Sequence, residues 1–127
     1  MKQIISTSEA PAAIGPYNQG TTLGNLVFTS GQIPLVAKTM EIVEGGIKEQ
    51  SKQVMENLKA VLEEAGSSCE NVLKTTCYLS NMDNFADFNQ VYETYFNAET
   101  APARSTVAVK TLPKNVLVEV EAIAYKK

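Results

Sequence analysis

The longest periodic pattern of apolar and polar positions along the chain is helical. Apolar or small residues recur at spacings of three and four between Gly46 and Ala65, and Gly66 follows where a helix commonly ends. The stripe consists of Ile47, Ser51, Val54, Leu58, Val61, Leu62 and Ala65. This pattern predicts one amphipathic helix whose apolar stripe faces a core.

A second helical pattern begins after Ser80 and Asp83, two residues with the spacing of a capping box. Its predicted buried stripe consists of Phe85, Phe88, Tyr92 and Tyr95. The sequence therefore predicts a second helix that packs an aromatic face against the same core.

Five segments have the composition or the alternation of β-strands: residues 2–6, 25–29, 71–79, 103–110 and 116–125. The order of strands, helix, strand, helix and two strands predicts an α+β fold with both helices on one face of a mixed sheet. Neither a repeat nor a linker is apparent, so we expect one domain over the 127 residues.

The last two strands are predicted to form a hairpin around Leu112. Burying both apolar faces together fixes the parity of the register, because a slip by one residue would turn one strand inside out. The expected register sets Arg104 opposite Glu121 and Thr106 opposite Glu119. One cation and two carboxylates would then share the sheet face that points away from the helices.

Two interpretations of this face are open. Arg104 and Glu121 could form a cross-strand pair on a hydrated face, which typically contributes under about 1 kcal/mol. However, Ala108, Leu117 and Ile123 interleave with the charges. A face this apolar favours the second interpretation, in which another subunit covers it.

Composition limits the chemistry that the protein can perform. The chain contains no histidine, which removes Ser-His and Cys-His nucleophile pairs and histidine metal sites. Chemistry must therefore rest on carboxylates, arginine, lysine, tyrosine, hydroxyls or backbone groups. Cys69 and Cys77 lack the spacing of a metal or redox site, so we interpret them as buried, reduced thiols.

Charge and hydropathy exclude two classes of partner. The net charge is −3 and the lysines are scattered, which argues against a nucleic-acid surface. No apolar run is long enough to span a membrane, and the first residues lack the features of a signal peptide. We therefore expect a cytoplasmic protein.

Several motifs, in this order along the chain, resemble those of the Rid (YjgF) family, and of its RidA group of enamine/imine deaminases in particular. They are "APAAIGPYNQG" (10–20), "TSGQIP" (29–34), "VLKTTCYL" (72–79), "PARSTVAVKTLPKN" (102–115) and "VEVEAIA" (118–124). The resemblance implies a chorismate-mutase-like (ferredoxin-like) fold. It also implies a homotrimer around a central barrel, with a ligand cleft at each subunit interface.

The same resemblance implies an activity: hydrolysis of 2-iminobutanoate and 2-iminopropanoate to 2-oxo acids and ammonia, without cofactor or metal. It assigns the substrate carboxylate to Arg104 and the activation of water to Glu119. The cleft-lining positions that it implies are Tyr17, Ser30, Gly31, Asn89 and Thr106. From the residues alone, only Arg104 and Glu119 would be singled out.

Thr106 departs from the pattern of bacterial members, which often have a cysteine at this position. A hydroxyl can still contact a carboxylate, but a mechanism that needs a thiol is not available here.

These residues suit imine chemistry. A protonated imine is already electrophilic, so the protein needs mainly to hold the carboxylate and supply an activated water. Arg104 can bind a carboxylate bidentately. Glu119 can act as a base if partial burial raises its pKa toward neutrality.

The alternative function is a non-catalytic regulator that binds small carboxylates in the same cleft. Glu119 favours the enzyme, because a module that only binds an anion has no need of a nearby carboxylate that repels it. A ribonuclease is disfavoured by the acidic charge.

Overall fold

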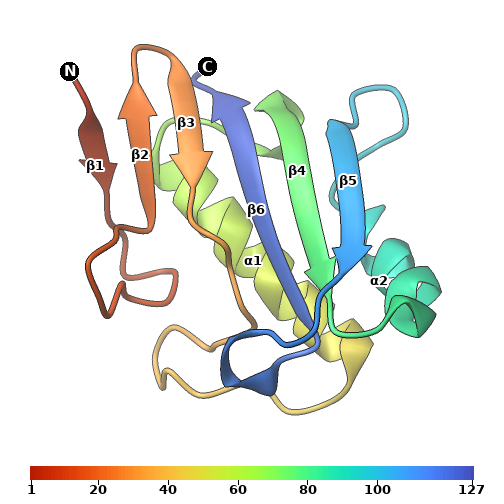
Figure 1. The fold of residues 1–127 in the computed structure, drawn as a ribbon. Coiled ribbons are helices and arrows are strands. Elements are labelled where there is room, and N and C mark those ends of the chain that lie inside the picture. Colours follow the sequence, from red (N-terminus) through yellow and green to blue (C-terminus); the bar gives the residue numbers. More distant parts are fainter.

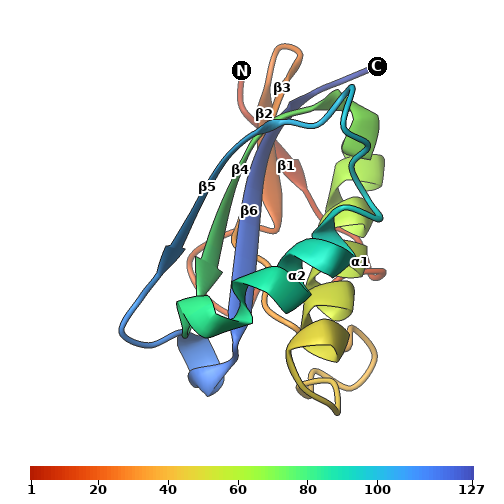
Figure 2. The same cartoon turned by 90° about the vertical axis from the view of Figure 1, so that its right-hand side faces the viewer.

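The computed structural model describes residues 1–127 as one six-stranded mixed sheet with two helices on one of its faces (Figures 1 and 2). The strands follow the order β1-β2-β3-β6-β4-β5, and all neighbours are antiparallel except β4 and β5, which are parallel. Their bounds are β1 Gln3–Ile5, β2 Gly20–Leu23, β3 Leu26–Thr29, β4 Val72–Leu79, β5 Ala103–Ala108 and β6 Val118–Tyr125. The predicted α+β class is confirmed.

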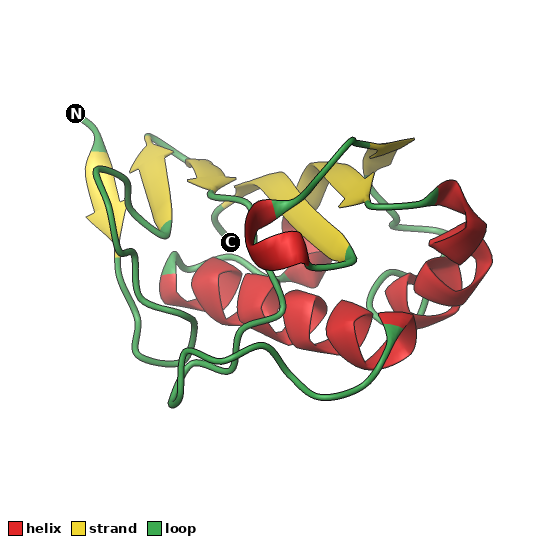
Figure 3. Ribbon diagram, turned by 60° about the horizontal axis from the view of Figure 1, so that its bottom comes forward, coloured by secondary structure: helices red, strands yellow, loops and turns green.

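Helices α1 (Ile47–Glu64) and α2 (Phe85–Tyr92) form the second layer, beneath the sheet in Figure 3. The periodicity of α1 predicted its bounds to within one residue, and Gly66 follows it with a φ of +82°, a conformation that glycine adopts without strain. Short 3₁₀ turns cover Cys69–Asn71, Met82–Asn84 and Pro113–Asn115. Neither helix combines the length and the apolar character that a membrane crossing requires.

The core lies between α1 and the central strands. Alternate residues of β6 are almost fully buried and face the helices: Val118, Val120, Ala122 and Ala124. From α1 they meet fully buried side chains such as Met55, Leu58 and Leu62. Burying this much apolar surface is what stabilises the two-layer arrangement.

Two local predictions were wrong. The second helical region begins with Asn81, whose Oδ1 accepts a hydrogen bond of 2.8 Å from the Asp83 N–H, so Ser80 and Asp83 form no capping box. Asn81, one residue after Ser80, caps a 3₁₀ turn and not the α-helix itself. Strand β2 was not predicted, because its sequence "GTTL" has no apolar run and it forms only by pairing with β1 and β3.

The predicted hairpin between the last two strands was also wrong. Strand β6 lies between β3 and β4, whereas β5 lies at the edge of the sheet beside β4. The physical reason is burial: β6 has one completely apolar face and takes a central place, whereas no residue of β5 is fully buried. A hairpin requires that strands adjacent in sequence are also adjacent in the sheet, and β4 separates β5 from β6.

The true register separates the charges that the hairpin brought together. Arg104 pairs with buried Thr75 and therefore faces the helices, whereas Glu119 and Glu121 pair with Tyr78 and Thr76 on the opposite face. Thr106 and Ala108 likewise lie on the helix side, through their pairing with Cys77 and Leu79.

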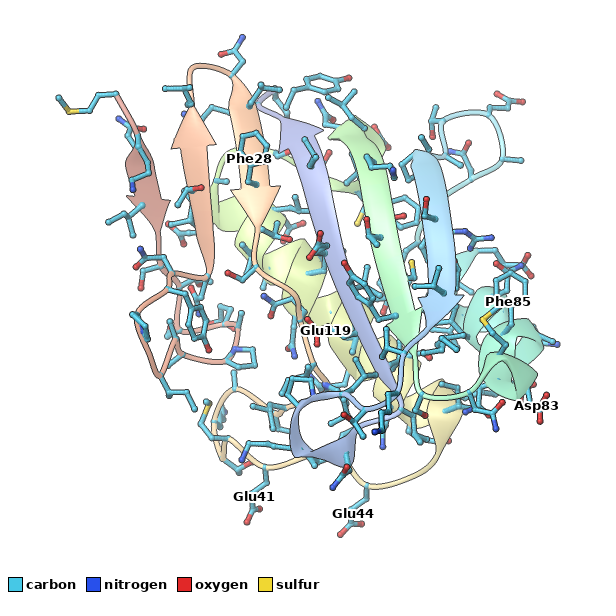
Figure 4. All side chains as sticks on the ribbon, in the orientation of Figure 1. Phe28, Glu41, Glu44, Asp83, Phe85 and Glu119 are labelled. Carbon is cyan, nitrogen blue, oxygen red and sulfur yellow. The ribbon has the colours of Figure 1, made fainter.

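The face away from the helices is nevertheless partly apolar, as predicted. Ile123 lies there as expected, whereas Ala108 lies on the helix side. Leu26, Phe28, Ile123 and Tyr125 are exposed there and pair across β3 and β6, and Val107 is exposed on β5. Phe28 is visible on this face in Figure 4.

Candidate functional site

Arg104 lies on the helix side of the edge strand β5, where α2 supplies its partners. One guanidinium nitrogen donates a hydrogen bond of 2.7 Å to Oδ1 of Asn89. The guanidinium carbon lies 4.6 Å from the centre of the Tyr92 ring and 5.4 Å from that of Phe85. These contacts are cation–π interactions, which orient the planar guanidinium and leave its remaining N–H groups free for a ligand.

The ring beneath Arg104 is itself held firmly. The Tyr92 hydroxyl shares a hydrogen bond of 2.7 Å with Oγ1 of Thr75, the residue that pairs with Arg104 across the sheet. Burial raises the pKa of Tyr92, so its phenol stays neutral at physiological pH. Sequence analysis treated Phe85 and Tyr92 only as core residues, because aromatic periodicity in a helix does not reveal a cation above the ring.

Thr106 lies next to Arg104 on the same face. Its Oγ1 is buried and has no hydrogen-bond partner within the chain. A buried hydroxyl without a partner is costly, and because its oxygen has almost no exposed surface, a ligand would reach it only after the side chain rotates.

The thiol paired with Thr106 belongs to Cys77. It is buried, and burial raises its pKa to about 11, which leaves a protonated thiol that is no nucleophile. The prediction of a buried thiol is confirmed for Cys77. Cys69 is only half-buried.

Glu119 occupies a different place, on the opposite face of the sheet near the start of β6 (Figure 4). It lines a cavity of about 420 Å³ together with Tyr17, Ser30 and Gly31. Burial raises the pKa of Glu119, and the nearby charge of Glu121 raises it further. The structure therefore places a carboxylate of raised pKa beside a cavity, an arrangement suited to a general base.

Gly31 permits this arrangement because it has no side chain. A methyl group at this position would lie 2.8 Å from the carboxyl carbon of Glu119, and closer still to one of its oxygens. The glycine is thus required for the close approach of the carboxylate.

The loop that carries Tyr17 is held by Gln19, a residue that sequence analysis did not identify. The Gln19 Nε2 donates hydrogen bonds of 2.9 Å to the Thr7 carbonyl and 2.8 Å to the Pro11 carbonyl. The main-chain carbonyl of Gln19 accepts a hydrogen bond of 2.9 Å from the Ser30 N–H, which ties the loop to the end of β3. The only signal in the sequence was a glutamine at the end of a loop rich in glycine and proline.

The predicted site residues thus form two groups on opposite faces. The first group is Arg104, Asn89 and Thr106; the second is Tyr17, Ser30, Gly31 and Glu119. The expected grouping of Arg104 and Thr106 with Glu119 on one face is wrong, because one chain places the arginine and the glutamate on opposite sides of its sheet. No three histidine, cysteine, aspartate or glutamate side chains are grouped so that they could hold a metal ion.

Comparison with known sequences identifies close relatives. The profile of the family described as Endoribonuclease L-PSP matches residues 7–126. A RutC family protein of Pyrococcus abyssi is 54% identical over 99% of this chain and 98% of its own length. The 2-iminobutanoate/2-iminopropanoate deaminase of Escherichia coli is 46% identical over 100% of both chains.

Solved structures agree with these sequence matches. The Escherichia coli YjgF gene product superposes with a TM-score of 0.91 at 45% identity, and covers 98% of this chain and 99% of its own. Escherichia coli TdcF with bound serine gives 0.91 at 44% identity, with the same coverage. With the family profile, the near-complete sequence matches and the shared fold in agreement, this chain belongs to the Rid (YjgF) family.

Proposed function

We propose that this protein hydrolyses short, reactive 2-imino acids and their enamines, such as 2-iminobutanoate and 2-iminopropanoate, to 2-oxo acids and ammonia. The observation that carries the proposal is Glu119, a carboxylate of raised pKa against Gly31 in a cavity. The relationship to a deaminase of that specificity supports it. We place the activity in the cytoplasm and assign it no cofactor.

Each group has a defined role in this reaction. Arg104, oriented by Asn89 and Tyr92, binds the carboxylate of the substrate, and the free hydroxyl of Thr106 adds a hydrogen bond. Glu119 takes a proton from a water molecule, whose oxygen adds to the imine carbon. The water and the protonated imine thus form a carbinolamine, and Glu119 returns its proton to the nitrogen of this intermediate. The carbon–nitrogen bond then breaks while the carbinolamine hydroxyl gives its proton back to Glu119, so that ammonia leaves and the carbonyl of the 2-oxo acid forms.

A second copy of the chain completes the site in this proposal. Arg104 and Glu119 of one chain face opposite sides of its sheet, so they cannot contact one small substrate. We propose a homotrimer in which each cleft combines the Arg104 group of one subunit with the Glu119 group of the next. The exposed apolar residues beside Glu121, including Phe28 and Ile123, supply a surface suited to such an interface.

Activity and site composition can be tested together. 2-Iminobutanoate is generated in situ by a threonine dehydratase, and its decay is followed with and without the protein. The proposal expects a clear acceleration over an inert protein of equal concentration. Decay at the background rate would contradict the function.

Coexpression of two inactive variants tests whether neighbouring subunits share a cleft. In random trimers of Arg104→Ala and Glu119→Gln chains, one cleft in each mixed trimer regains both native residues, so about a quarter of wild-type activity should return. The control is Arg104→Ala with an Arg104→Ala/Glu119→Gln double variant, which should stay inactive. Absence of recovery in the first mixture would place the site elsewhere.

A second candidate is a non-catalytic regulator that binds small carboxylates at the Arg104 group. The relative solved with bound serine favours it, since serine is a small carboxylate. Saturable binding of serine or 2-oxobutanoate that depends on Arg104, without acceleration of imine decay, would support this function instead of the enzyme.

A further inference from the structure

Met40 has an unusual backbone conformation. Its φ is +58°, in the left-handed region that disfavours a residue with a long side chain. The turn that imposes this angle is rigid: the Met40 N–H donates 2.7 Å to the Val36 carbonyl, and the Val36 N–H donates 2.8 Å to that of Glu41. Glycine would adopt this conformation without strain.

The segment before the turn is anchored to α1. The buried side chain of Asn57 donates hydrogen bonds of 3.1 Å to the Ile33 carbonyl and 2.9 Å to that of Leu35. Leu35 also forms a bridge with Ile42 across the turn. The position of residue 40 is therefore determined by the surrounding structure and not by the preference of methionine.

The location of the Met40 side chain suggests why the strained conformation is retained. This side chain is half-buried and lines the same cavity as Glu119. The lining of this cavity also includes the apolar residues Ile14, Ile33 and Leu35. A strained residue at a ligand cavity is the pattern expected when a side chain is retained for function.

We propose that Met40 is a specificity-determining residue, which fits the Glu119 cavity to imino acids with an apolar side chain longer than the ethyl group of 2-iminobutanoate. This inference rests on the proposed function and extends it. One chain alone contributes a cavity of about 420 Å³ to the proposed cleft, within the range of small-molecule sites. The flexible thioether suits a linear apolar chain, since methionine fills irregular gaps well.

Two substitutions separate the strain from the side chain. Met40→Gly removes both, whereas Met40→Ala removes the thioether and keeps a Cβ in the left-handed conformation. The readout is the ratio of kcat/KM for 2-iminohexanoate to that for 2-iminopropanoate, each generated in situ by an amino-acid oxidase. The ratio should fall by about tenfold or more in both variants, and Tm should rise by about 2–5 °C in Met40→Gly only.

The matched control is Asn115→Gly. Asn115 also has a left-handed φ, of +56°, but it does not line the cavity. Its ratio should equal that of the wild type. A ratio within twofold of wild type in both Met40 variants would overturn the proposal, whatever happens to Tm.

A failure of the proposed function would be recognised separately, as a wild-type protein inactive on both imines. In that case, calorimetric affinities for 2-oxohexanoate and pyruvate decide the role of Met40. Selective loss of 2-oxohexanoate binding in Met40→Gly supports it, and equal affinities in variant and wild type overturn it.

Discussion

The guanidinium of Arg104 and the carboxylate of Glu119 lie on opposite faces of the same sheet. The first packs on Tyr92 of α2, and the second lies against Gly31 beside an open cavity. A four-carbon substrate cannot contact both sides of a sheet at once. Each chain therefore carries two separate halves of the proposed site.

Glu119→Gln should lower kcat by about 10²-fold or more, because glutamine keeps the shape but cannot accept a proton. The control is Glu121→Gln, which removes the neighbouring charge that helps to raise the pKa of Glu119. This control should keep its plateau kcat and move the acidic limb of its pH profile to lower pH. Steady-state kinetics from pH 5 to 9 on one imine measure both effects. An inactive Glu121→Gln variant with an active Glu119→Gln variant would mean that Glu121 is the base and Glu119 the neighbouring charge.

Glu119→Gln should also change how stability depends on pH. The folded-state pKa of Glu119 is raised, so the folded protein binds this proton more tightly than the unfolded chain does. Below the unfolded pKa of about 4.3, the carboxyl group is protonated in both states and costs the folded protein no stability. As the pH rises through the folded pKa, the group ionises in its buried site and the folded protein loses stability. Tm of the variant should exceed that of the wild type at pH 8 and match it at pH 4; equal differences at both pH values would contradict the raised pKa.

Gly31→Ala should displace the Glu119 carboxylate, because the new methyl group occupies its place. The carboxylate is the mobile end of a long side chain, so it can rotate away and leave the fold intact. We expect a loss of kcat approaching that of Glu119→Gln, with Tm changed by only a few degrees. The control is Gly46→Ala, because no atom lies closer than 3.9 Å to the added methyl group. Gly24→Ala is not suitable, since the φ of +58° at Gly24 would strain an alanine.

Arg104→Lys should lose most activity through KM. An ammonium cannot donate to Asn89, stack on Tyr92 and bind a carboxylate bidentately at the same time. Asn89→Ala should raise KM less, because the ring of Tyr92 still orients the guanidinium. Unchanged KM in both variants, measured on the same imine, would mean that Arg104 has only a structural role.

Local patterns in the sequence were sufficient for α1 and for most strands, whereas α2 ends at Tyr92 and does not include the predicted Tyr95. The stripe of α1 and the stop at Gly66 depend on residues a few positions apart, and so does the alternation that buries Val118, Val120 and Ala122. The family motifs, likewise, named Arg104 and Glu119 as candidates before any contact was known.

Only the tertiary structure decided which way β5 faces. Alternation groups Arg104 with Thr106, and Ser105 with Val107, but neither set is apolar enough to identify the buried side. The answer came from distant partners, since parallel pairing with β4 and the side chains of α2 turn Arg104 toward the helices. Strand order and the left-handed angle of Met40 were hidden for the same reason: both are set by contacts between residues far apart in the chain, which local preferences do not encode.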